Sequence, residues 1–253
     1  MGKSTVLAKI SRPRLFDVVP RVRLFELLDR NRGRPLIWIS AAPGSGKTAL
    51  VASYLDSRGL PTIWYQLDQS DADPAKFLEL LGDAAKALRR RQQPALPRLL
   101  PEHMEDLGTF SSLYFRTFFS RLPIGAVLVL DNFQEIPRES TVHDLVAQCA
   151  AEMPPDSSLI CISRLECPAS LVRAAASGSV LFVGWEELKM RVDEVQMVAR
   201  QRGLMDDRVA ERLHREDGGW AAGIALLLEN IGALSRPDDT GGSILRASLF
   251  NYF

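Results

Sequence analysis

The sequence predicts a three-layer α/β fold, in which a parallel sheet lies between two layers of helices, followed by a small helical domain. Short apolar runs of strand-forming residues recur along the first two thirds of the chain, and helix-compatible segments separate them. The five runs cover residues 35–40, 62–67, 126–130, 158–163 and 180–183. Buried parallel strands have this composition, and alternation of strand and helix is typical of a doubly wound sheet.

The clearest helix signal begins at Asp73, a capping residue that is followed by Pro74 at the first helical position. Apolar residues then recur with helical spacing at Phe77, Leu78, Leu81, Ala84, Ala85 and Leu88. Beyond about residue 186 no further run of the strand type occurs. The pattern there predicts helices at 193–202, 206–214 and 220–234, which would form the small helical domain.

Residues 41–48 read Ala-Ala-Pro-Gly-Ser-Gly-Lys-Thr and stand between the first apolar run and a helix-compatible segment. This is the pattern of a phosphate-binding loop, whose glycines let successive backbone N–H groups face phosphate oxygens. Ala41 stands where the pattern usually has glycine, but that place closes the strand and does not need a positive φ. The sequence therefore predicts a nucleoside triphosphate held by Pro43, Gly44, Ser45, Gly46, Lys47, Thr48 and Ala49.

The same loop predicts a magnesium ion. The hydroxyl of Thr48 and the carboxylate of Asp131, which follows the apolar residues 127–130, are typical of the magnesium shell in such sites. Lys47 adds a positive charge, and we expect it on the solvent side of the fold rather than in the core. We therefore expect ATP or ADP and Mg²⁺ as cofactors.

The base of the nucleotide is predicted to be adenine, because the chain has no Asn-Lys-x-Asp sequence of the kind that recognises guanine. Val19, Pro20 and Arg21 precede an amphipathic stretch with apolar residues at Val22, Leu24, Phe25, Leu27 and Leu28. These three residues could run beside the base. They could equally be the turn that leads into a packing helix.

Hydrolysis of ATP needs a carboxylate that polarises the attacking water, and this residue often follows the magnesium-binding acid directly. Here the next residue is Asn132, and an amide cannot accept a proton. Three alternatives stay open: Glu135 is the base, Asp68 is the base, or hydrolysis is slow, which we favour.

Arg164 follows the run 158–163 and is therefore expected at the carboxyl edge of the sheet, where ligands bind in such folds. It could sense the γ-phosphate. An arginine that is simply solvated at a strand end fits the same position.

The charge balance and the cysteines exclude several classes of function. Thirty-one basic residues equal 31 acidic ones, which argues against direct DNA binding by this chain. Cys149, Cys161 and Cys167 have no C-x-x-C spacing and are expected to be reduced thiols rather than zinc ligands. No stretch approaches the ~20 apolar residues of a membrane span. We expect a cytoplasmic protein with no membrane partner.

The domain boundaries follow from these patterns. We predict a nucleotide-binding domain at 1–185 and a small helical domain at 186–235. Residues 235–243 are polar and rich in Gly, Pro and Asp, so 236–253 are predicted to be a linker and the start of a further domain. Because the chain ends on apolar residues, we expect it to be a truncated piece of a longer protein.

The sequence resembles the MalT-like branch of the signal-transduction ATPases with numerous domains (STAND), which form the N-terminal part of large LuxR-type transcriptional activators. The resemblance lies in residues 9–13, 19–21, 40–48, 64–68, 71–77, 128–132, 163–164 and 219–226, of which the last two segments are the most specific. It implies a P-loop NTPase core of the ASCE or AAA-like class. It also implies that 248–253 open a winged-helix domain, and that a helical-repeat sensor and a C-terminal helix-turn-helix, absent from this chain, would follow.

The resemblance implies an ATP-controlled switch with slow hydrolysis. Inducer and ATP together would promote self-association of the full-length activator, which would bind DNA only through the absent C-terminal domain. Residues 19–21 would lie by the adenine and Arg164 would be the sensor. Residues 219–226, which lack proline here, would replace the Gly-x-Pro element that reads the nucleotide. The inducer is not identified by the sequence.

Two other functions are weighed against this switch. One is a conventional P-loop ATPase or small-molecule kinase without a transcriptional role, against which Asn132 argues, because such an enzyme needs an efficient base. The other is a DNA-binding module in its own right, which the balanced charge disfavours.

Overall fold

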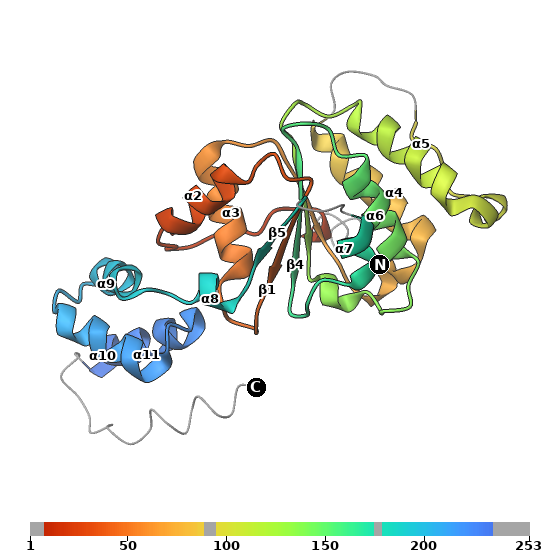
Figure 1. Cartoon of the computed structure of the whole chain (residues 1–253). Coiled ribbons are helices and arrows are strands. Elements are labelled where there is room, and N and C mark those ends of the chain that lie inside the picture. Colours follow the sequence, from red (N-terminus) through yellow and green to blue (C-terminus); the bar gives the residue numbers. More distant parts are fainter. Residues whose placement is uncertain (1–7, 89–94, 175–178, 235–253) are drawn as a thin grey trace.

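The computed structural model describes residues 8–88, 95–174 and 179–234. Its centre is a sheet of five strands in the order β2-β3-β4-β1-β5, and every pair of neighbouring strands is parallel. The strands are β1 (Leu36–Ser40), β2 (Thr62–Gln66), β3 (Val127–Asp131), β4 (Ser158–Ser163) and β5 (Val180–Val183). The predicted α/β class is confirmed, as are all five predicted strands (Figure 1).

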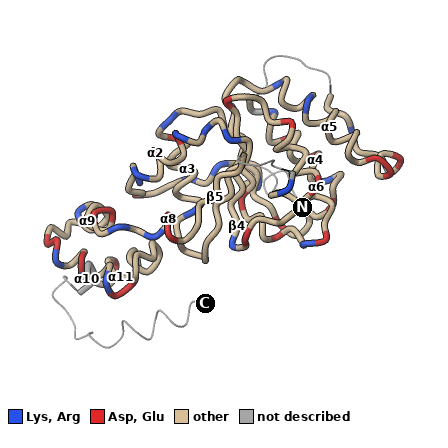
Figure 2. Tube along the Cα trace, viewed as in Figure 1, with Lys and Arg blue, Asp and Glu red and all other residues tan. Residues whose placement is uncertain are grey.

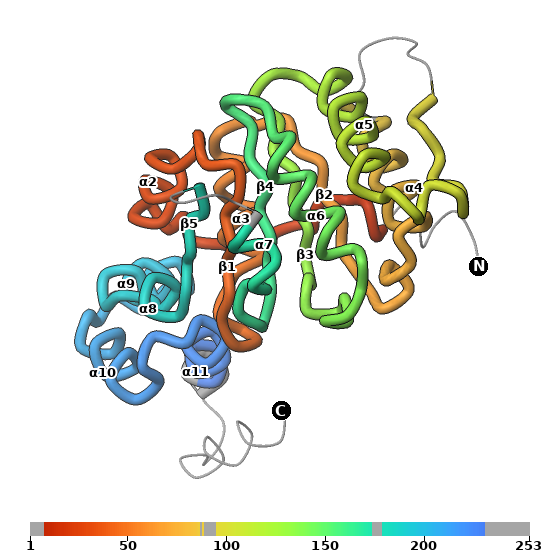
Figure 3. The backbone as a smooth tube through the Cα atoms, turned by 45° about the vertical axis from the view of Figure 1, so that its right-hand side comes forward, coloured from red at the N-terminus to blue at the C-terminus, as the bar shows by residue number. Residues whose placement is uncertain are grey.

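Helices cover both faces of the sheet, as Figure 3 shows. Side chains alternate between the two faces along β1, because successive residues of a strand point to opposite sides. Ile37 and Ile39 pack with α2 (Val22–Arg30) and α3 (Lys47–Arg58). Leu36 and Trp38 pack in the opposite core, which α4 (Pro74–Ala84), α5 (Leu107–Phe119), α6 (Val142–Ala151) and α7 (Ala169–Ala174) cover.

The helix predicted after Asp73 is α4, and its start has the expected cap. The Asp73 carboxylate accepts a hydrogen bond of 2.8 Å from the backbone N–H of Lys76, and Pro74 stands in the first turn. Short 3₁₀ turns complete this layer and its connections, at Gln69–Ala72, Ala85–Leu88, Pro101–Asp106 and Phe133–Glu135.

The register of the sheet places four strand ends at one edge. Ser40 of β1 pairs with Ser163 of β4, and Gln66 of β2 pairs with Asp131 of β3. Strand β4 lies between β1 and β3, so the segments after β1, β3 and β4 leave the sheet side by side. All the residues predicted to act on phosphate therefore come to the carboxyl edge of the sheet.

A helical unit follows the sheet through the single turn α8 (Trp185–Leu188). It consists of α9 (Val192–Gln201), α10 (Asp207–Asp217) and α11 (Ala221–Leu234). These helices were predicted within a few residues of their observed bounds. They bury a separate cluster of apolar side chains: Met190, Val195, Ala199, Ala210, Leu213, Ile224, Leu227 and Leu228.

Three further expectations can be compared with the structure. The three cysteines are free thiols, and no metal-binding group of His, Cys, Asp or Glu occurs within the described ranges. Among the same residues no helix is long and apolar enough to cross a membrane. Basic and acidic residues are interspersed along the trace (Figure 2). The predicted linker and winged-helix start, at 236–253, lie outside the described residues.

Candidate functional site

The phosphate-binding loop joins the end of β1 to the start of α3. Gly44 and Gly46 have φ values of 73° and 82°, in the left-handed region that favours glycine. Gly46 is the N-cap of α3 and provides no side-chain hydrogen bond to the first helical turn. Because the first N–H groups of a helix have no partner within it, this end of α3 is suited to bind an anion.

Lys47 is more buried than its sequence position suggested. Only 9 % of the residue is exposed, so the expectation of a solvent-side charge was wrong. Its ammonium donates to the backbone carbonyls of Ala41 and Ala42, at 2.7 and 2.9 Å, and to the Ser45 hydroxyl at 3.1 Å. The loop folds around the ammonium, because its carbonyls are the acceptors that compensate the buried charge.

Thr48 and Asp131 meet although they are far apart in the sequence. The Thr48 hydroxyl lies 3.2 Å from both carboxylate oxygens of Asp131, which is only 3 % exposed. Burial raises the pKa of Asp131, although the Asn132 N–H, the Thr48 hydroxyl and the charge of Lys47 act in the opposite direction. A buried carboxylate beside a hydroxyl is the donor set that Mg²⁺ uses in phosphate sites, so these two residues fit the predicted ion.

The two proposed general bases do not line the site. A cavity lies over the phosphate-binding loop, and neither Glu135 nor Asp68 is among the described residues that line it. Asp68 forms an ion pair of 2.8 Å with Lys9. Partial burial raises the pKa of Asp68, but bonds from Lys9 and Ser70 outweigh it and lower the pKa to about 2, which makes the group a weak base.

Two amides lie where a base would be needed. Asn132 and Gln134 both line the cavity. Gln134 accepts a hydrogen bond of 3.1 Å from the backbone N–H of Arg164, and its own amide lies 3.4 Å from Asn132 Oδ1 and from Glu135 Oε1. Amides can orient a water molecule but cannot remove its proton. Gln134 was missed by the sequence analysis, which considered only carboxylates.

Arg164 lies at the carboxyl edge as predicted. Its side chain is exposed, lines the cavity and forms no ion pair within the described part of the chain. Its guanidinium acts on Lys47: burial and then the charge of Arg164 lower the pKa of Lys47 to about 8, against an opposing effect of Asp131. The two positive charges therefore face the same cavity and repel each other. A bound anion would reduce this repulsion.

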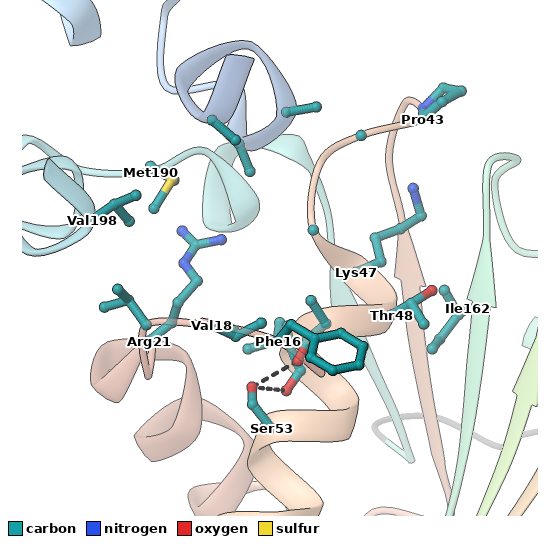
Figure 4. Close-up of a pocket in the computed structure, with 18 of the residues that line it drawn as sticks. Phe16, Val18, Arg21, Pro43, Lys47, Thr48, Ser53, Ile162, Met190 and Val198 are labelled. Atoms are coloured by element: carbon teal, nitrogen blue, oxygen red, sulfur yellow. Dashed lines mark hydrogen bonds between the residues drawn. The ribbon is translucent and has the colours of Figure 1, made fainter. Parts of the chain in front are cut away.

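The cavity over the loop has a volume of about 530 Å³, within the range of small-molecule sites. Figure 4 shows side chains from the N-terminal segment, the loop, α3 and the helical unit around it. Its apolar wall includes Phe16, Val18, Leu50, Met190 and Val198. The sequence predicted Val19, Arg21 and the loop at this site but not Phe16, Met190 and Val198, because no local pattern links these distant segments.

Arg21 connects this cavity to the helical unit. Only 7 % of the residue is exposed, and its guanidinium binds both oxygens of Glu194, at 3.2 and 2.9 Å. It also donates to the carbonyls of Leu188 and Lys189, at 2.6 and 3.0 Å. Val19 lines the cavity, whereas Pro20 is exposed and is not among the described lining residues. The Arg21 side chain is thus occupied by protein groups, which explains its position without a base contact.

The start of α11 contacts the phosphate-binding loop directly. The Trp220 indole N–H donates to the Pro43 carbonyl at 2.9 Å, and the Ala222 backbone N–H donates to the Gly44 carbonyl at 3.0 Å. A Cβ atom at Gly44 would lie 2.7 Å from the Cβ of Ala222, so only glycine allows this approach. Residues 219–226, singled out in the sequence, therefore do meet the nucleotide-binding loop.

The chain is similar in sequence to one protein family and to two transcriptional regulators. Residues 23–164 match the sequence model of the family described as "Nephrocystin 3, N-terminal". The chain is 26% identical over 229 residues to the HTH-type transcriptional regulator MalT of Vibrio cholerae. It is also 26% identical over 225 residues to the MalT protein of Serratia proteamaculans. Each alignment covers 87% of this chain but only 24% of the relative, so the chain spans about a quarter of their length.

A solved structure supports the fold. The Orc1 protein of Aeropyrum pernix, determined in complex with DNA, superposes with a TM-score of 0.50 at 18% sequence identity, covering 93% of this chain and 66% of that one. At this identity the likeness concerns the fold alone, which is that of the α/β P-loop NTPases. The chain is thus similar in sequence to a part of the MalT proteins and similar in fold to the Orc1 protein.

The buried ion pair between Arg21 and Glu194 generates the first prediction. Glu194→Gln removes the charge that compensates the guanidinium, and we expect the free energy of unfolding at neutral pH to fall by about 3 kcal/mol. Urea unfolding measures this free energy. Glu229→Gln is the control, since this exposed carboxylate pairs with Arg202 at the surface and should change stability by less than about 1 kcal/mol. Equal effects of the two substitutions would contradict the prediction.

The same pair sets a pH dependence. Burial raises the pKa of Glu194, but the bond from Arg21, the Arg191 N–H and the charges of Arg21 and Arg23 outweigh it, and the pKa is lowered from 4.5. The stabilisation is therefore present above the unfolded-state pKa and is lost as the pH falls through the lower, folded-state pKa. The difference between wild type and Glu194→Gln should shrink on acidification below about pH 4.5.

Lys47 generates a third prediction. Because its pKa is lowered to about 8, its ammonium loses its proton at mildly alkaline pH, and the affinity for ATP should fall as the pH rises. Calorimetric titration with Mg·ATP at about pH 7 and about pH 9 should show a weakening of up to roughly tenfold. Lys47→Met should bind weakly at both values with no such pH step. The same pH step in both proteins would assign it to another group.

Proposed function

The chain belongs to the family described as Nephrocystin 3, N-terminal, and we propose that it is an ATP-binding regulatory switch with slow hydrolysis. Residues 43–49 would hold the phosphates, with Thr48 and Asp131 as protein ligands of Mg²⁺. Residues 1–185 would bind the nucleotide, 186–235 would read its state, and 236–253 would connect to a winged-helix domain.

One observation carries this proposal: the loop suited to bind phosphate is itself hydrogen-bonded to α11. The carbonyls of Pro43 and Gly44 accept bonds from Trp220 and Ala222 of the helical unit. A change of loop conformation between ATP and ADP would therefore reach α11 without an intermediate element. A conventional ATPase or kinase has no need for this connection.

The polar groups around the cavity favour slow turnover. Asn132 and Gln134 can position water. Two carboxylates are among the described residues that line the cavity: Asp131, which is expected to serve Mg²⁺, and Asp17, which belongs to the N-terminal segment and does not follow a strand of the sheet. Arg164 would contact the γ-phosphate, and its loss of that contact after hydrolysis would distinguish the two nucleotide states. Reset of the switch, rather than product formation, would be the role of hydrolysis.

Regulation would take effect in a longer protein that contains this region. Relatives about four times as long carry the name "HTH-type transcriptional regulator". By analogy we propose that a longer chain containing this region is a cytoplasmic transcriptional activator of the LuxR type. ATP and an inducer would together promote its self-association, and a C-terminal domain outside this chain would bind DNA.

Three measurements on the purified chain test the proposal together. Calorimetry should show saturable binding of Mg·ATP and of ADP, and single-turnover hydrolysis should be well below the ~1 to 100 s⁻¹ of kinases. Hydrogen exchange of the N–H groups of Trp220 and Ala222 should differ between the ATP and ADP complexes. Rapid turnover with unchanged exchange would favour the conventional ATPase, and the absence of any nucleotide binding would overturn both functions.

Asp131 generates a further prediction. In the wild type, Mg²⁺ should strengthen ATP binding, whereas in Asp131→Ala the affinity should be the same with magnesium and with a chelator. The fold should persist, because burial already disfavours the charged form of the Asp131 carboxylate, as its raised pKa indicates, and alanine carries no charge to bury. Asp144→Ala, at an exposed position of α6, is the matched control and should keep the magnesium effect. A magnesium effect that survives in Asp131→Ala would contradict the assigned role.

A further inference from the structure

A second cavity lies on the other side of Arg164. It has a volume of about 680 Å³, and it is lined by the middle of β1, the segment after β3, the start of α6, the end of β4 with the segment after it, and α7. Arg164 and Gln134 line both this cavity and the one over the phosphate-binding loop. We propose that this second cavity binds a small organic anion with an aromatic body and a hydrogen-bond donor. The binding itself does not rest on the nucleotide switch proposed above.

The floor of the cavity is aromatic. Trp38 and Phe133 meet edge to face, with ring centroids 5.1 Å apart, and the ring of His143 lies 5.4 Å from Phe133. The Trp38 indole N–H donates to the Leu165 carbonyl at 3.2 Å, which holds the segment after β4 over the floor. Such a floor favours a planar apolar group through burial of its surface and through ring contacts.

The rim of the cavity is positively charged. Arg138, Arg164 and Arg173 line it, and Glu166 is the acidic residue among the described lining. None of the three guanidinium groups forms an ion pair with another described residue, although the chain as a whole carries equal numbers of basic and acidic residues. Three cations against one carboxylate, beside an apolar floor, favour a ligand with a carboxylate or a similar anionic group.

His143 adds a requirement for a donor. It is 6 % exposed, and its Nε2 lies 2.9 Å from the Pro137 carbonyl, which can only accept a hydrogen bond. Nε2 therefore carries the proton of the neutral ring, and Nδ1 is left as an acceptor. Nδ1 is buried and has no partner among the described residues. A hydroxyl or N–H group of a ligand would satisfy it.

Arg164 makes the two cavities interdependent, and this part of the inference rests on the proposed function. A single guanidinium cannot direct its donors fully to two anions in different cavities. The anion should therefore bind more weakly when ATP is present than when ADP is present, because only ATP offers a γ-phosphate to Arg164.

The probe for the test is para-hydroxyphenylacetate, which has a carboxylate, an aromatic ring and a hydroxyl. Calorimetric titration of the protein saturated with Mg·ADP should show saturable binding, and the neutral para-hydroxyphenylacetamide should bind at least tenfold more weakly. Arg138→Gln with Arg173→Gln should weaken the anion at least tenfold and leave ADP affinity unchanged. The control is Arg208→Gln with Arg215→Gln, which removes the same charge from exposed positions of α10.

A second variant tests the cavity without a change of charge. Ser170→Trp would fill the cavity from α7 and should abolish binding of the probe while circular dichroism shows an intact fold. The inference is overturned if the wild type shows no saturable binding, if the amide binds as well as the acid, or if neither the arginine pair nor Ser170→Trp weakens the probe. Equal probe affinity with ATP and ADP would overturn only the coupling through Arg164. Loss of ADP binding would instead count against the proposed nucleotide switch.

Discussion

The unpaired backbone N–H groups at the start of α3 are the constraint on which the site depends. They face outward because β1 ends at Ser40 and the loop turns through two left-handed glycines before the helix begins at Lys47. A cluster of such donors favours an anion. The other elements of the site supply what the donors lack: a buried acid beside Thr48, a second cation at Arg164, and an apolar wall from the N-terminal segment and the helical unit.

Buried charge explains why these elements are held so closely. Lys47 is enclosed by carbonyls of its own loop, and Arg21 is enclosed by Glu194 and two carbonyls of the segment before α9. A buried cation costs much more when its partners are removed than the pair contributes when intact. The position of the helical unit relative to the sheet is therefore fixed by a polar contact that tolerates few alternatives. A movement of that unit would have to keep Arg21 satisfied.

Much of the fold could be predicted from the sequence because its signals are local. Each strand is a short apolar run, and Asp73 with Pro74 marks a helix start from residues that touch each other. The meeting of Thr48 with Asp131 could also be expected, since both follow strands of one parallel sheet. The pairing of Arg21 with Glu194 could not, because 173 residues separate them and nothing local marks Glu194 as buried. The burial of Lys47 was missed for a related reason: its partners are backbone carbonyls, which leave no trace in the side-chain pattern.

The segment Gly-Gly-Trp-Ala-Ala-Gly at 218–223 shows how the loop and the helical unit constrain each other. A Cβ atom at Gly219 would lie 2.5 Å from the Met190 carbonyl oxygen, and one at Gly223 would collide with the Asp217 carboxylate. Gly219 allows the close approach of two backbone segments, and Gly223 leaves room for the side chains of Asp217 and Trp220 next to Ala222, whose N–H donates to the Gly44 carbonyl. Proline at either alanine would remove an N–H group, and at Ala222 this is the group that donates to the loop. The lack of proline in residues 219–226 is thus compatible with close contact to the loop, because here the contact is made by a backbone N–H that proline lacks.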